Sequence, residues 1–99
     1  MVAMFYDEWG IMRDDKERFI GVNANRLIEQ YLELRPTVYL EGKRYYQYSQ
    51  KKGVWKSKTL LNITRELRKL VHKRAPAVWD SALSREVEAM LPLICDSVD

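Results

Sequence analysis

The sequence predicts an α+β fold, in which three helices pack on a small three-stranded antiparallel β-meander. Two observations carry this prediction. Three stretches place apolar residues at helical spacing, and a β-branched, aromatic stretch with two glycine turns lies between the first two of them. The class includes winged-helix-like arrangements. With 99 residues, the chain has room for one hydrophobic core, because domains usually take roughly 100 to 200 residues.

We expect three parts along the chain. Residues 1–22 form an irregular lead-in, because their apolar residues follow no sustained period. Residues 23–91 form a single α+β domain, and residues 92–99 are a tail or the start of a downstream region.

The first helix is expected over residues 24–34. Asn23 or Asn25 can cap its start, because a short polar side chain accepts a hydrogen bond from a free backbone amide there. Pro36 ends it, since proline supplies no amide donor and pushes the preceding residue out of the helical region. Its apolar residues share one face: Leu27, Ile28, Tyr31 and Leu32.

The meander is expected over residues 37–56. Strands are predicted at 37–40, 43–49 and 54–56, joined by a tight turn at residues 41–42 and a longer turn that Gly53 closes. This stretch is the part of the chain where β-branched and aromatic residues replace the helical pattern.

Alternation along the second strand divides its aromatic residues between two faces. Tyr46 and Tyr48 point one way, while Tyr45 and Gln47 point the other. Trp55, on the third strand, can stack across from the first pair. A small sheet must bury one face to be stable, so we expect Tyr46, Tyr48 and Trp55 to pack in the core. Stacking on nucleic-acid bases is the alternative role for these three residues.

The second helix is expected over residues 59–74, with Ser57 or Thr59 as its cap. Charged residues fill most of its surface, and one apolar stripe remains. That stripe consists of Leu60, Ile63, Leu67, Leu70 and Val71.

The third helix is expected over residues 81–91, after the good capping residues Asp80 and Ser81. Pro92 ends or kinks it, because proline removes a helical hydrogen bond. Its apolar face consists of Leu83, Val87, Met90 and Leu91.

Charge is distributed very unevenly along the chain. Residues 43–74, here called the basic block, hold eleven bases and one acid, a net charge of +10, whereas the remainder holds six bases and thirteen acids, a net charge of −7. A polyanion would relieve the self-repulsion of this block. The alternative is a solvated face that pairs weakly with the acidic flanks. The candidate phosphate contacts are Lys51, Lys52, Lys56, Lys58, Arg65, Arg68, Lys69, Lys73 and Arg74.

The sequence offers no catalytic constellation. The four glycines are isolated, so no phosphate-binding loop is present, and we expect no cofactor. His72 is the one histidine, on the charged side of a helix, and Cys95 is the one cysteine, expected to be a small buried residue; together they predict no metal site. The acidic pairs at residues 7–8 and 14–15 are expected to be solvated loop charges. No apolar run approaches the roughly 18 residues of a membrane span, so we expect a soluble, cytoplasmic protein with no membrane partner.

Residues 38–48, 53–56 and 60–67 together resemble a recognisable pattern. It is similar to the domain just N-terminal to the superfamily-three helicase core in phage and plasmid primase-helicases, and in the poxvirus primase-helicase. The resemblance covers residues 19–91 and implies a non-catalytic replication domain in a hexamer-forming parent. Carried over to this chain, its structural residues are Tyr46, Tyr48, Gly53 and Trp55.

The chain departs from that family pattern in two respects. Helicase motifs and the acidic motifs of primase catalysis are not recognisable in these 99 residues, so ATPase and unwinding activity would belong to downstream sequence. The connection over residues 74–81 is also longer than the turn of a simple helix-turn-helix, so no recognition helix is assigned.

These observations lead to a functional hypothesis. We expect an accessory domain that contacts single-stranded or duplex DNA without sequence preference and is linked to a downstream helicase domain of the same chain. For a phage or plasmid protein, the setting would be the bacterial cytoplasm. The alternative is a protein-interaction or homo-oligomerisation module whose basic block docks an acidic partner.

Overall fold

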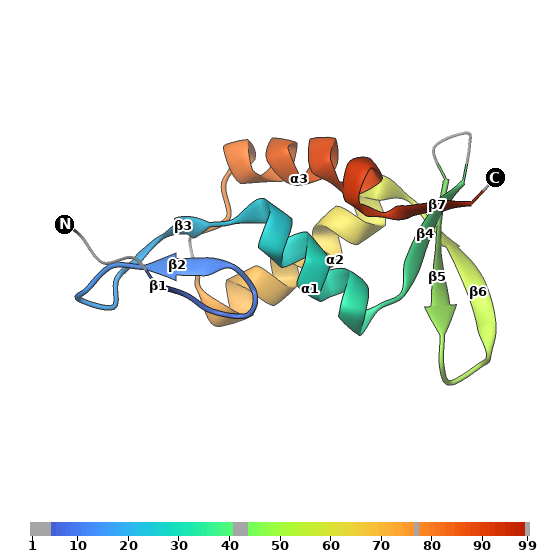
Figure 1. Cartoon of the computed structure of the whole chain (residues 1–99), viewed down its shortest axis with the longest axis horizontal. Helices are drawn as coiled ribbons and strands as arrows, with labels where there is room; N and C mark the ends of the chain where they lie inside the picture. The colour runs from blue at the N-terminus through green and yellow to red at the C-terminus, as the bar shows by residue number, and fades with distance from the viewer. Residues whose placement is uncertain (1–4, 41–43, 77, 99) are drawn as a thin grey trace.

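The computed structural model describes residues 5–40, 44–76 and 78–98. Within them, three helices lie between two small sheets, one at each end of an elongated molecule (Figure 1). The elements are β1 (Phe5–Tyr6), β2 (Ile11–Arg13), β3 (Phe19–Val22), α1 (Ala24–Leu34), β4 (Thr37–Leu40), β5 (Arg44–Ser49), β6 (Val54–Lys58), α2 (Leu60–Arg74), α3 (Ser81–Ile94) and β7 (Asp96–Val98). The strand orders in the two sheets are β1-β2-β3 and β6-β5-β4-β7. The predicted α+β class and its three helices are confirmed.

Each helix begins at a side-chain cap. The Asn23 side chain accepts from the backbone amide of Arg26 at 3.1 Å, and the Asp80 carboxylate accepts from the amide of Leu83 at 2.8 Å. Thr59 and Asn62 cap α2 reciprocally, since each side chain accepts from the other residue's backbone amide. The predicted helix starts are therefore confirmed, and the caps explain them.

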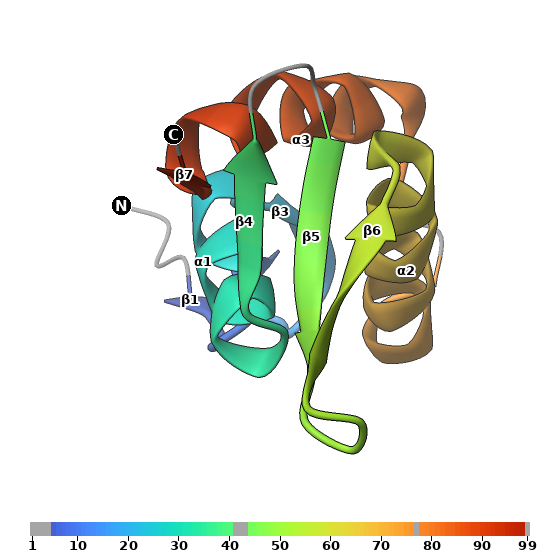
Figure 2. The same cartoon turned by 90° about the vertical axis from the view of Figure 1, so that its right-hand side faces the viewer.

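The predicted meander is present as β4, β5 and β6, which pair antiparallel in chain order. Gly53 has a φ of 64°, and its amide closes the β5–β6 turn onto the carbonyl of Ser49 at 2.7 Å. The predicted turn at residues 41–42 lies outside the described residues. Figure 2 shows that the helices lie behind this sheet and that the β5–β6 turn projects beyond them.

The chain end differs from the expected tail. Helix α3 passes through Pro92 and continues to Ile94, and β7 then pairs parallel with β4. Leu91 and Cys95 on either side of the last turn are buried, and the Cys95 amide bonds the Leu91 carbonyl at 2.9 Å. Burial of apolar side chains and the pairing of β7 with β4 thus stabilise this part of the chain, although Pro92 removes one hydrogen bond of the helix.

The expected irregular lead-in is wrong. Residues 5–22 form an antiparallel three-stranded sheet, β1-β2-β3, which contributes Trp9 and Ile11 to the core. Gly10 permits its approach to α1. Its φ is 78°, and a Cβ there would lie 2.7 Å from the carbonyl oxygen of Asn23, so only glycine fits this position without rearrangement.

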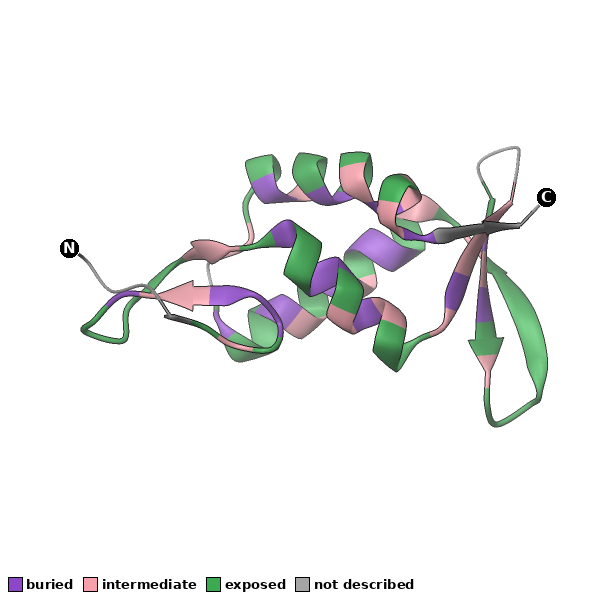
Figure 3. Ribbon diagram, in the orientation of Figure 1, coloured by how far each residue is buried: buried purple, intermediate pink, exposed green. Residues whose placement is uncertain are grey.

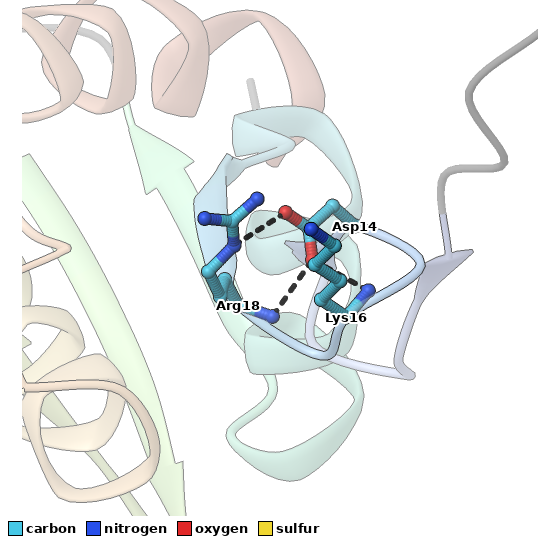
Figure 4. Close-up of polar contacts among 3 residues, drawn as sticks. All are labelled: Asp14, Lys16 and Arg18. Atoms are coloured by element: carbon cyan, nitrogen blue, oxygen red, sulfur yellow. Dashed lines mark hydrogen bonds and ion pairs between the residues drawn. The ribbon is translucent and has the colours of Figure 1, made fainter.

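The expectation that the acidic pairs are solvated loop charges is wrong for one carboxylate of each pair, because Asp7 and Asp14 accept hydrogen bonds from the backbone. Asp14 is buried, and its carboxylate accepts from the backbone amides of Lys16 and Arg18 and from the Arg18 guanidinium, each at 2.9 Å (Figure 4). The Asp7 carboxylate similarly accepts from the amides of Trp9 and Ile11. The backbone hydrogen bond from Arg18 is the largest cause that holds the pKa of Asp14 below its ordinary value. These carboxylates organise the turns of the N-terminal sheet.

Asp14→Asn is expected to destabilise the protein at pH 7 and to have a smaller effect at pH 3. A carboxyl whose folded pKa is lowered stabilises the fold above its unfolded pKa of about 4, and that contribution is lost as pH falls through the folded pKa. Urea denaturation of both proteins at the two pH values measures the difference. Asp15→Asn, at an exposed neighbour, is the control and should leave stability unchanged. A destabilisation by Asp14→Asn that is equal at both pH values would contradict the assignment.

The hydrophobic core lies between the three helices, the inner face of the second sheet and the start of β2 (Figure 3). All three predicted apolar stripes supply it, and Cys95 is buried there as expected, with its thiol 3.2 Å from the Thr37 carbonyl. The fully buried side chains with the largest volumes are Tyr31, Ile11, Leu27, Ile28, Ile63, Leu67, Leu91, Val71 and Val87.

The sheet buries the opposite face from the one we expected. The alternation along β5 is confirmed, but Tyr45 and Gln47 point inward and are buried, whereas Tyr46 is half-buried. Tyr48 and Trp55 are 37% and 50% exposed. The expectation that Tyr46, Tyr48 and Trp55 pack in the core is therefore wrong, because the helices cover only the other face.

Candidate nucleic-acid interface

The basic block contributes most of the cations to one open groove between the β5–β6 hairpin and α2. The groove has a volume of about 1030 Å³. Five of the nine predicted contact residues line it: Lys51, Lys56, Lys58, Arg65 and Lys69.

Regular secondary structure explains why these five gather. On β6, Lys56 and Lys58 lie opposite Gln47 and Tyr45, so both occupy the sheet face that is turned toward the helices. On α2, residues four apart lie on one side of the helix, which places Arg65 and Lys69 on the facing wall. A strand with alternating lysines and a helix with bases one turn apart therefore form the two walls.

The other four predicted residues lie outside the groove lining. Lys52 is in the β5–β6 turn, close enough to Lys56 to act on its titration. Arg68 and Lys73 are exposed on α2. Arg74 stacks over the indole ring of Trp9, with its guanidinium carbon 4.8 Å from the ring centroid, at the end of α2 near the N-terminal sheet. The structure therefore brings five of the nine predicted contacts together in the groove and places the other four elsewhere.

A polar chain crosses the inner wall of the groove and ties three elements together. The Gln47 amide on β5 donates to the Tyr31 hydroxyl on α1 at 2.5 Å, and that hydroxyl donates to the Glu66 carboxylate on α2 at 3.2 Å. Glu66 also forms an ion pair with Arg35, which precedes β4. Gln47, Glu66 and Arg35 all line the groove, so this chain fixes its walls relative to one another.

The groove carries an excess of positive charge without matching acids. Its lining includes six bases and one acid, Glu66, and that acid is already paired with Arg35. Within the described ranges, the two ion pairs are Arg35–Glu66 and Arg18–Asp14, and neither uses a base of the basic block. The acidic flanks therefore form no ion pair with the block in the part of the chain that the structure describes, and a solvated basic face stays the alternative.

Neighbouring lysines of the hairpin act on the ammonium group of Lys56. Lys52, within hydrogen-bonding reach of Lys56, lowers the pKa of the Lys56 ammonium below its ordinary value, and the charge of Lys58 acts in the same direction. An anion placed among these three ammonium groups would relieve that repulsion.

Sequence reasoning missed one cation of the groove and all of its neutral polar lining. Arg35 lies outside the basic block, between a helix and a proline, so a count of charge along the chain does not find it. Arg35 directly follows α1 and reaches the groove by forming an ion pair with Glu66 on α2, a contact that only the folded chain shows. The neutral polar residues of the lining are Gln47, Ser49, Gln50, Ser57 and Asn62.

Two buried tyrosines of the core, Tyr31 and Tyr45, have hydroxyl groups that are hard to ionise. Desolvation raises the pKa of Tyr45 to about 12 and also raises that of Tyr31, so both hydroxyls stay protonated near neutral pH. Within the described ranges, no three of the His, Cys, Asp and Glu side chains come together as metal ligands would. No described helix is both long and apolar enough to cross a lipid bilayer.

Comparison with protein-family models, with curated proteins and with solved structures finds no match.

Proposed function

We propose that this chain is a non-catalytic accessory domain that binds nucleic acid through the groove between the β5–β6 hairpin and α2. One observation carries the proposal: six bases line a single open groove whose one acid is already engaged in an ion pair. Phosphate groups are the polyanion that such a surface favours, because each contact releases condensed counterions.

The contacts are expected to be independent of base sequence. The groove cations are lysines and arginines in exposed or half-exposed positions, and contacts that such side chains make to phosphate oxygens carry no sequence information directly. We propose DNA as the partner, with Lys51, Lys56, Lys58, Arg65 and Lys69 as the phosphate contacts and Lys52 beside them at the turn.

The resemblance to the domain that precedes superfamily-three helicase cores supports a place for this domain in replication. In that setting the domain would hold DNA next to a helicase domain of the same chain. ATPase and unwinding activity would be supplied by that neighbour, while this domain contributes affinity.

The direct test is an anisotropy titration with fluorescently labelled single-stranded and duplex oligonucleotides in low salt. The proposal expects saturable binding to at least one of them, with similar affinity for unrelated sequences. Sedimentation of the protein alone at low and high salt addresses the competing possibility. The proposal would be contradicted if the protein bound no oligonucleotide and formed oligomers that dissociate at high salt. That result would favour a module that docks an acidic partner.

A further inference from the structure

In the part of the chain that the structure describes, no helix covers the outer face of the second sheet, which carries aromatic side chains. All three helices lie on the other side of β4, β5 and β6, as Figures 1 and 2 show from two directions. On the uncovered face, the rings of Tyr48 and Trp55 lie across from each other on neighbouring strands, with centroids 5.3 Å apart and planes at 54°. Half of the Trp55 surface is exposed.

This aromatic pair lies on the same hairpin as the lysines that are candidate phosphate contacts. Tyr48 itself lines the basic groove, and Trp55 immediately precedes Lys56 on β6. Lys51 follows Tyr48 by three residues, which is at most about 10 Å of extended chain. Because side chains alternate along β6, Trp55 and Lys56 point to opposite faces of one exposed edge strand. One short hairpin therefore presents aromatic rings on one face, ammonium groups on the other and further lysines at its turn.

We propose that Tyr48 and Trp55 stack with the bases of a single-stranded nucleic acid whose phosphates are held by the hairpin lysines and the basic groove. This inference rests on the proposed function and names the form of nucleic acid that the site takes. Unpaired bases can turn a face toward an aromatic ring, whereas bases inside a duplex are already stacked on their neighbours. The exposed lysines of the hairpin turn next to the rings, Lys51 and Lys52, favour this occupant over an apolar protein surface, which would cover them without supplying a counter-charge.

The experiment compares Trp55→Ala with the wild-type protein on an oligothymidylate, an oligouridylate of equal length and a blunt duplex. Loss of one stacked base should weaken binding to the single strands roughly 5- to 150-fold and leave duplex binding unchanged. Trp55→Phe should retain most of the affinity. The slope of affinity against salt should stay at the wild-type value, because no phosphate contact is removed. A loss on both single strands supports the stacking proposal, and tighter binding of the wild-type protein to the oligothymidylate would support DNA as the partner.

Two further measurements keep the result decisive if Trp55→Ala is unstable. Trp55→Leu retains apolar bulk on the sheet but has no π face, so it should lose affinity as the alanine variant does while melting near the wild-type temperature. Tryptophan fluorescence of the wild-type protein should be quenched by the single strand, and the quenching should be reduced in Trp55→Phe, where the buried Trp9 and half-buried Trp79 remain.

Wild-type affinity in Trp55→Leu, or equal affinity of the wild-type protein for duplex and single strand, would overturn the stacking proposal. Neither result would contradict the proposal that the groove binds phosphates. Binding that does not depend on salt concentration would contradict that proposal. Binding of the oligonucleotides with unchanged Trp55 fluorescence would likewise overturn the stacking proposal alone.

Discussion

Neutralising three groove bases together, with Lys56→Gln, Lys58→Gln and Arg65→Gln, is expected to weaken binding to a single strand roughly 100-fold at about 0.1 M salt. Each phosphate contact on a single strand contributes about 0.7 to the salt slope, which corresponds to roughly a fivefold change in affinity at that salt concentration. The three side chains come from both walls of the groove. Glutamine keeps part of each aliphatic stem, so the change removes charge with little loss of packing.

The matched control removes the same number of charges elsewhere, with Arg68→Gln, Lys73→Gln and Arg85→Gln. These three residues are exposed on α2 and α3 and do not line the groove. We expect less than about a fivefold loss, the contribution of a single phosphate contact. An equal loss in the two triple variants would mean that net charge, rather than the groove, determines binding.

Tyr31→Phe is expected to destabilise the protein by about 1 to 3 kcal/mol, although it removes one oxygen atom. The Tyr31 ring is fully buried, and its hydroxyl both accepts from Gln47 and donates to Glu66. Without it, the buried Gln47 amide loses its acceptor and Glu66 loses a donor, and an unsatisfied buried polar group bears its full desolvation cost.

Thermal denaturation followed by circular dichroism measures this effect, since about 1 kcal/mol shifts the melting temperature of a domain of this size by about 4 to 8 °C. Tyr46→Phe is the control, because Tyr46 lies half-buried on the outer sheet face. A melting temperature for Tyr31→Phe equal to that of Tyr46→Phe would show that the polar chain contributes nothing to the fold.

Local signals account for what could be predicted of the fold. The helices and the meander follow from side-chain caps at Asn23, Thr59 and Asp80, from apolar spacing and from the turn at Gly53. Each of these is a short-range interaction that the sequence displays directly.

The N-terminal sheet could not be predicted in the same way. Its strands have two to four residues, too few for an alternating pattern to be recognised. They depend on turns that Asp7 and Asp14 organise and on the close approach of Gly10 to α1. Such contacts join segments whose proximity only the folded chain reveals.

The choice of buried sheet face and the composition of the groove were also beyond the sequence pattern. Strand β5 carries aromatic residues on both faces, so alternation separates Tyr45 from Tyr46 but does not say which one the helices cover. Periodicity similarly brings Lys56 and Lys58 onto one face, yet their position opposite α2 depends on tertiary packing. That packing adds Arg35 to the groove and places Arg74 against Trp9 instead.

The central claim is that the groove holds nucleic-acid phosphates, and the salt dependence of binding tests it most directly. With five phosphates neutralised, a plot of log affinity against log salt concentration should fall with a slope of about −3.5 on a single strand, or about −4.5 on duplex DNA. The groove triple variant should show a slope of about −1.4 on the single strand. A slope near zero, or no binding to either form at the lowest salt concentration, would contradict the account.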